Sequence, residues 1–226
     1  MYDTLVIGES KSTADVIFEW LHGEIVTLAI LPGSKISETD IARRFDVSRQ
    51  PVRDAFRRLH NLDLLDIRPQ RATVVRRFSL EEIEATRFVR LAVELEVIEG
   101  AAQLWDQARS DALAENLDEQ SDALMAGDAG LFHELDYGFH KLICDLSDVP
   151  KAFETINQCK RKVDRLCVLG LSNDESVAEV LDDHRAIANA LGRRSVQDAR
   201  AHIRHHVGRL DQTIAEIHQT HTDFFQ

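Results

Sequence analysis

Apolar residues recur every three to four positions along most of this chain, which is the period of an α-helix with one buried face. Residues 12–29 carry such a stripe, which ends at Leu31-Pro32-Gly33. After residue 78 the same period returns in long segments separated by glycine, proline or a Ser-Asn pair. The helices predicted there span residues 79–105, 109–126, 130–146, 149–170, 174–191 and 195–220. The pattern predicts an all-α, antiparallel bundle for the second part of the chain.

Residues 37–60 are predicted to form two short helices joined by a tight turn. Ser37 is expected to cap the first helix, with Asp40 as the acid of a capping box, and Ser48 is expected to cap the second. The face of the second helix opposite its apolar positions carries Arg49, Gln50, Arg53 and Arg57. Arginine binds phosphate or a guanine edge and glutamine suits adenine, so this helix is typical of a major-groove reader. A solvated basic face is the alternative interpretation.

Two short β-prone segments follow at residues 64–68 and 73–77, with a polar turn that contains Pro69 between them. They predict a two-stranded wing beside the second short helix, with Arg68 and Arg71 contacting DNA phosphates.

Charge is distributed unevenly along the 226 residues. Between Arg43 and Arg77 there are ten arginines, four aspartates and no lysine, a net charge of +6 in a chain of net charge −12. Residues after 77 carry −13. Positive charge is thus concentrated where a duplex would dock. We therefore predict a mainly α protein with a winged helix-turn-helix domain at residues 1–78 and an all-helical domain at 79–226.

The three cysteines, Cys144, Cys159 and Cys167, contain no CxxC pair, which favours reduced thiols in a cytoplasm. The sequence has no apolar run of membrane-spanning length and no N-terminal segment of the signal-peptide type. We expect a cytoplasmic protein without a membrane partner.

The helical domain contains a set of residues that suits a metal. Asp136 and His140 are four positions apart and therefore project from one helix face, and His184 and His206 stand on two later helices. One carboxylate and three imidazoles from three helices could converge on a divalent ion in a bundle core. Spacing alone leaves His133 and His202 open as alternatives.

The chain also resembles a known family over essentially its full length. The pieces that carry the likeness in the first third are Leu31-Pro32-Gly33, Ser37-Glu38, Asp40-Ile41-Ala42 and the run 47–59. Those in the remainder are Arg90 and Glu94, Asp136-x-x-Phe139-His140-x-x-Ile143, Asp183-His184-x-x-Ile187, and Ala199-Arg200 leading to His206-Val207. The first third resembles the winged-helix domain of GntR-family bacterial transcription regulators, and the remainder is similar to the FadR-type, metal-binding FCD effector domain.

The resemblance implies roles for individual residues. It implies that Asp136, His140, His184 and His206 hold a divalent metal, and it selects His206 over His202 and His205. For DNA contact it favours Arg49 and Arg53, followed by Ser48 and Arg71. The chain departs from the family pattern at Gln70-Arg71-Ala72, where a glycine is usual at the wing tip, and at Thr39, where some relatives have an arginine.

A metal held by one anionic and three neutral ligands keeps residual positive charge, and a six-coordinate ion would leave two positions for a carboxylate effector. Zinc or nickel suits imidazole-rich sites and manganese suits them less well. Arg90 would clamp a second acidic group of the effector; an i,i+4 pair with Glu94 is the alternative interpretation.

Two functions of different classes follow from these features. The first is a ligand-responsive, sequence-specific transcription regulator, expected to be a repressor that binds a pseudo-palindromic DNA operator as a homodimer and responds to a small organic acid. The second is a helical-bundle metalloenzyme with an appended DNA-binding module. A hydrolase needs a general base besides the metal ligands, for which the sequence offers only Asp183 and Tyr137, so we expect no enzyme.

Overall fold

The structure of the protein is a computed structural model that describes residues 11–68, 71–170 and 174–226. It divides into two compact units, one made of residues up to Phe78 together with Gln226 and the other of Ser79–Phe225. Three expectations lie outside the described residues: the absence of a signal segment at the N-terminus, the place of Gln70 in the wing, and the helix break at Ser172-Asn173.

The described residues of the first unit form three helices and a small sheet. Its elements are α1 (Thr13–Val26), β1 (Lys35–Ile36), α2 (Glu38–Phe45), α3 (Arg49–Asn61), β2 (Leu65–Asp66) and β3 (Thr73–Val75). α1 packs against α3, and their apolar faces form a core that includes Ile17, Leu21 and Phe56. The predicted winged helix-turn-helix fold is confirmed.

The sheet has one strand more than expected. Its order is β1-β3-β2, and both neighbouring pairs are antiparallel. A strand of two residues, like β1, has no hydrophobic period by which it could be recognised. The paired part of the wing is shorter than the predicted segments 64–68 and 73–77, since pairing covers only Leu65–Asp66 and Thr73–Val75.

Two of the predicted helix caps differ in detail. The Ser37 hydroxyl accepts the Asp40 N–H at 3.4 Å, but the Asp40 carboxylate pairs with Arg43 instead of completing a capping box. Ser48 occupies the cap position of α3 but makes no side-chain capping bond. The usual donor three residues after the cap is missing there because Pro51 has no N–H.

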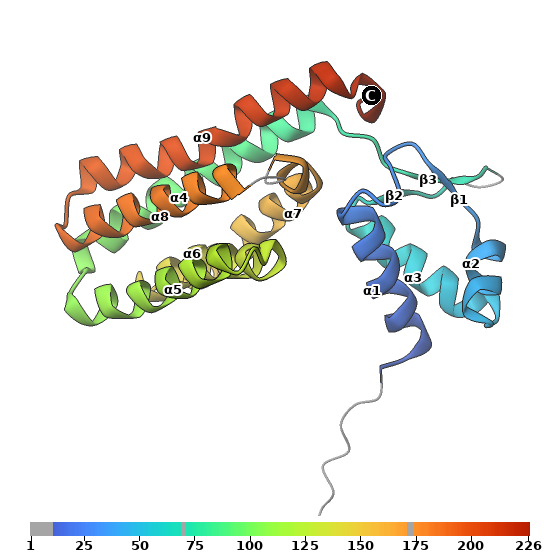
Figure 1. The fold of residues 1–226 in the computed structure, drawn as a ribbon, viewed down its shortest axis with the longest axis horizontal. Helices are drawn as coiled ribbons and strands as arrows, with labels where there is room; N and C mark the ends of the chain where they lie inside the picture. The colour runs from blue at the N-terminus through green and yellow to red at the C-terminus, as the bar shows by residue number, and fades with distance from the viewer. Residues whose placement is uncertain (1–10, 69–70, 171–173) are drawn as a thin grey trace, which may run out of the picture. The chain divides into compact units, whose positions relative to one another are not determined.

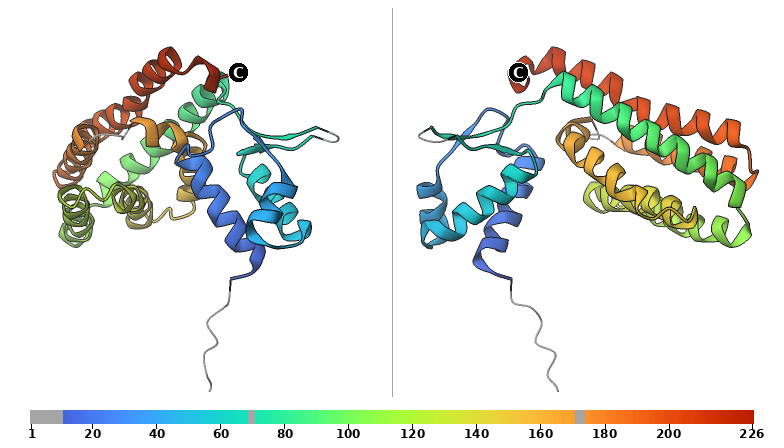
Figure 2. Two further views of the ribbon diagram at one scale, coloured as in Figure 1. Left: turned by 45° about the vertical axis from the view of Figure 1, so that its right-hand side comes forward. Right: turned by 180° about the vertical axis from the view of Figure 1, so that it is seen from behind.

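The second unit is a bundle of long helices. They are α4 (Leu80–Leu104), α5 (Gln107–Met125), α6 (Ala129–Leu146), α7 (Ala152–Gly170), α8 (Asp174–Gly192) and α9 (Val196–Thr220), and a short 3-10 turn, η1 (Thr222–Phe224), follows. α9 packs against α4 and α8, while α5 packs against α6 and α8 (Figures 1 and 2). The predicted helical bundle is confirmed, with α5 starting two residues early because Asp106 caps it through the Arg109 N–H.

The bundle interior has an apolar part and a polar part. Trp105, Ile98, Phe139 and Ile187 belong to one continuous buried cluster. Charged and polar side chains, among them Glu94, are buried in the same unit. Among the described residues, no helix combines the length and the hydrophobicity needed to cross a bilayer. Because buried polar groups cost free energy unless they are paired, the buried polar side chains of this unit require a chemical explanation.

Candidate metal centre and DNA-binding surface

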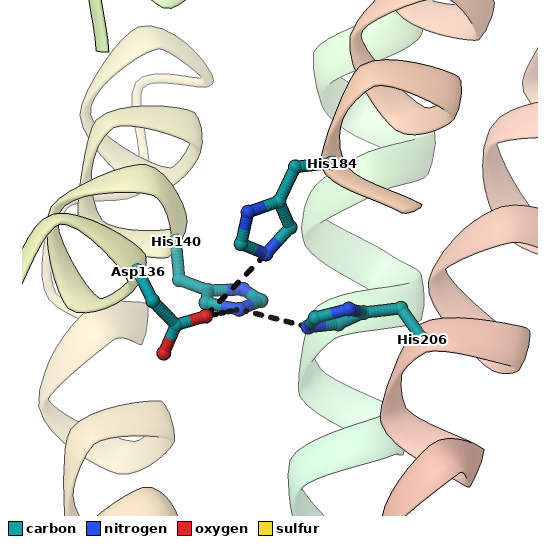
Figure 3. Close-up of side chains that lie close together, drawn as sticks. All are labelled: Asp136, His140, His184 and His206. Carbon is teal, nitrogen blue, oxygen red and sulfur yellow. Dashed lines mark hydrogen bonds and ion pairs between the residues drawn. The ribbon is translucent and has the colours of Figure 1, made fainter. Parts of the chain in front are cut away.

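Four polar side chains meet in the interior of the helical unit (Figure 3). α6 supplies Asp136 and His140, one helical turn apart, while α8 supplies His184 and α9 supplies His206. One donor atom of each lies within 4.8 Å of the donor atoms of the others. None of the four residues exposes more than 9% of its surface. The structure thus brings together the four residues that the family resemblance implies as metal ligands.

The short distances in this group join the atoms that would bind a metal. His206 Nε2 lies 3.2 Å from His140 Nε2. Asp136 Oδ1 lies 3.4 Å from His184 Nε2 and 3.7 Å from His140 Nε2. Three imidazoles therefore present the same ring nitrogen, Nε2, to one small volume that they share with a carboxylate oxygen.

The polar groups around two of the rings determine which ring nitrogen carries hydrogen. Gln120 Oε1 lies 2.7 Å from His184 Nδ1, and the Gln120 amide is oriented by its donation to Asn116 Oδ1 at 2.7 Å. Glu94 Oε2 lies 3.1 Å from His140 Nδ1. Gln120 Oε1 accepts from His184 Nδ1, and the Arg90 guanidinium, which can only donate, lies 3.2 Å from His140 Nε2. The network therefore assigns the hydrogen to Nδ1 in both rings and leaves a lone pair on each Nε2.

These lone pairs suit a cation. His184 Nε2 is buried and has no hydrogen-bond partner among the described residues. Burial lowers the pKa of His184 and lowers that of His206 to about 3, so both rings are neutral at neutral pH. Buried acceptors without a donor cost free energy. A divalent ion bound by three neutral imidazoles and one carboxylate would satisfy them, so the residues present fit a metal.

A buried lysine that the sequence analysis missed contacts the carboxylate of this site. Lys160 on α7 places its Nζ 2.5 Å from Asp136 Oδ2. Burial by itself would raise the pKa of Asp136, but the Lys160 ammonium holds that pKa well below its usual range. A signal was present in the sequence, because Lys160 stands between Ile156 and Val163 on an apolar helix face, where a charge needs a buried partner.

Arg90, the predicted effector contact, is buried beside the same site. Its Nε donates to Glu94 Oε1 at 2.6 Å, which is the intrahelical pair that the sequence also predicted. A terminal nitrogen of Arg90 lies 3.2 Å from His140 Nε2. The two interpretations of Arg90 are therefore compatible, since one guanidinium is paired with Glu94 and also lies within hydrogen-bonding distance of the histidine nitrogen.

The remaining candidates lie outside this group. Among the described residues, the histidines that do not join it include His133, His202 and His205. Of the two candidate general bases, Asp183 is paired with Arg209, and the Tyr137 hydroxyl donates to Asp164 at 2.7 Å. Both candidates are already engaged, which gives no support to a role as a base.

The residues predicted to read DNA are exposed. Arg49, Gln50, Arg53 and Arg57 lie on the exposed face of α3, while Val52, Phe56 and Leu59 are buried on its other face. Ser48 at the start of α3 and Arg71 at the end of the wing turn are also exposed.

Other arginines of the basic segment stabilise the fold instead. Arg58 pairs with Asp15 at 2.7 Å and covers the Phe18 ring, and Arg44 lies 4.4 Å from the Trp20 ring centroid. The net charge of this segment therefore overstates how many of its cations DNA could contact.

Both parts of the chain are similar to known proteins. Residues 13–75 match the family described as bacterial regulatory proteins, gntR family, and residues 86–209 match the FCD domain. The chain is 32% identical over 209 residues to the HTH-type transcriptional repressor RspR of Escherichia coli (strain K12), covering 92% of both chains. A putative transcriptional regulator GntR from Rhodococcus sp. RHA1 has a similar fold, with a TM-score of 0.71, 22% identity and coverage of 91% of this chain and 99% of that one. E. coli McbR/YncC has a TM-score of 0.68 at 20% identity, with coverage of 93% and 99%.

Proposed function

The chain belongs to the GntR family of bacterial transcription regulators, with a helix-turn-helix DNA-binding domain and an FCD effector domain, and we propose that it regulates transcription in response to a small carboxylate bound at a divalent metal. The observation that carries this proposal is that three buried histidine Nε2 atoms and one carboxylate oxygen lie within 4.8 Å of one another, with lone pairs assigned to two of these nitrogens.

We assign the metal to Asp136, His140, His184 and His206, with zinc or nickel favoured over manganese by the number of imidazoles. Such an ion supplies a Lewis acid to which an anionic ligand can bind. Glu94 and Gln120 hold the rings from behind, and Lys160 keeps one oxygen of Asp136 engaged.

Charge balance favours an anionic effector. Asp136 is paired with Lys160, Glu94 is paired with Arg90, and His184 and His206 are neutral. A divalent ion would therefore add positive charge that these residues do not offset, and anions compensate such charge in a buried site. Arg90 adds a planar donor group suited to a carboxylate. The organic acids are the ligand class that this combination favours.

Communication between the site and DNA requires a structural connection. An effector changes DNA affinity only if it binds the DNA-competent and incompetent states with different affinity. α4 is our candidate for the connection, because it begins at Leu80, directly after the wing, and carries Arg90 and Glu94.

The effector proposal predicts stabilisation that depends on metal. A hydroxy-dicarboxylate at 100 times its Kd should stabilise the metal-loaded protein by about 2.7 kcal/mol and do little for the chelator-stripped protein. Arg90→Lys keeps a positive charge beside Glu94 but loses the planar guanidinium that can bind a carboxylate through two nitrogens. The variant should therefore lose most of this stabilisation by the carboxylate while keeping its metal. Thermal unfolding with a panel of small carboxylates measures the effect. Equal stabilisation of loaded and stripped protein would contradict a metal-anchored effector.

A homodimer would place two reading helices on the half-sites of a pseudo-palindromic operator. The outer face of α4 is our candidate for its contact, because Phe88 is 75% exposed there and Val89 beside it is 43% exposed, and large apolar groups so exposed often mark an interface. We expect Phe88→Asp to weaken dimerisation by about 2 kcal/mol or more, as loss of an aromatic anchor does. Sedimentation equilibrium measures it. Met125→Asp is the matched control, since Met125 on α5 is 77% exposed, and a dimer broken by that change alone would move the interface away from α4.

A further inference from the structure

Two carboxylates contact the basic side chains on the exposed face of α3, so this face is not purely cationic. Glu38, the first residue of α2, places its Oε2 3.0 Å from Arg53 Nε and 3.5 Å from an Arg49 terminal nitrogen. Asp54, on α3 itself, lies 3.2 Å from the Gln50 amide and 3.5 Å from Arg57. The four residues proposed to read DNA are therefore each in contact with an acid.

Glu38 differs from Asp54 because it acts across two helices. The Ser37 hydroxyl caps α2 and so defines where Glu38 begins the helix. α2 packs against α3, and residues of both helices belong to one buried cluster. The Glu38 side chain is 26% exposed, which is less than either arginine that it contacts. The carboxylate is thus attached to a packed framework, while the two arginines are long, exposed side chains that would otherwise sample many rotamers.

The contact leaves Arg53 able to read a base. Glu38 binds Arg53 through Nε, whereas guanine O6 and N7 can be bound by the two terminal nitrogens of a guanidinium. An acid near DNA phosphates lowers affinity for every sequence by repulsion. An acid that orients an arginine before binding reduces the conformational cost of one particular contact. The first effect is independent of sequence, whereas the second applies only where Arg53 meets its base.

We propose that Glu38 is a positioning residue for DNA recognition, which orients Arg53 and Arg49 and raises the ratio of operator to non-specific affinity. This inference rests on the proposed role of α3 as the reading helix. Loss of operator binding in Arg53→Ala tests that role separately from Glu38.

The experiment compares Glu38→Gln with a matched control, Asp40→Asn. Both changes remove one negative charge from the first turn of α2, but Asp40 pairs with Arg43, which is not among the proposed reading residues. The probes are an operator selected from random duplexes with the wild-type protein and a random duplex of equal length. Both variants should bind the random duplex slightly more tightly, and Glu38→Gln alone should lower the specificity ratio, by about tenfold if it removes one well-oriented base contact.

Two further variants separate geometry from charge. Glu38→Asp keeps the charge but shortens the side chain, so it should lower the specificity ratio without tightening random-duplex binding. In the Glu38→Gln/Arg53→Ala double variant, the ratio should be close to that of Arg53→Ala alone, because residues acting through one contact are not additive. A ratio unchanged in Glu38→Gln, an equal loss in Asp40→Asn, or additive losses in the double variant would each overturn the proposal.

Discussion

His206→Ala should remove most of the bound metal, which wild-type protein should carry at about one divalent ion per chain when four protein ligands meet at one site. Its Nε2 lies 3.2 Å from that of His140, so alanine takes away one of the converging donors and not an outer support. Outer partners of a ligand are typically worth about 10- to 100-fold in metal affinity, and loss of a ligand should cost at least as much. Elemental analysis of purified protein, followed by chelator competition, measures the loss.

His202→Ala is the control for this prediction. His202 lies one turn before His206 on α9, is partly exposed, and does not belong to the group of four. It should retain the metal, and so should His205→Ala, because His205 is exposed. Metal lost in the His202 variant and kept in the His206 variant would show that our choice of ligands is wrong.

Arg53→Ala should weaken specific operator binding by about 1–3 kcal/mol if Arg53 reads a base edge, and it should relax the preference at one position of the site. The side chain is exposed on α3, so its removal should leave the folded domain intact. Binding to the promoter nearest the gene, and to single-base variants of it, measures both effects.

Arg71→Ala provides the comparison on the wing. If Arg71 contacts phosphate, its loss should reduce affinity for all sequences and make the slope of log K against log salt shallower by about one. Unchanged DNA binding in both variants would remove the assignment of α3 and the wing to the duplex.

The sequence determined the helical architecture of the protein. The spacing of Ile17, Leu21 and Ile25, and of Val52, Phe56 and Leu59, is local information, because a helix face is defined by residues three or four apart. The same locality applies to the cap at Ser37. Local sequence was not sufficient at Ser48, because Pro51 lacks the N–H that a capping bond needs. It was also not sufficient for β1, which is too short to have a hydrophobic period and exists because β3 pairs with it.

The candidate site divides in the same way. Asp136 and His140 are one turn apart, so the sequence alone could pair them. Which histidines of α8 and α9 complete the set depended on a family resemblance, because spacing carries no information between helices.

The roles of Lys160, Gln120 and Glu38 emerged only from the tertiary structure. Their partners lie 24, 64 and 15 positions away along the chain. A buried lysine, a buried amide and a carboxylate between two arginines acquire a role only when separate helices pack together. Local pattern therefore determines where the helices lie and which faces they bury, whereas packing decides which polar groups on those helices meet.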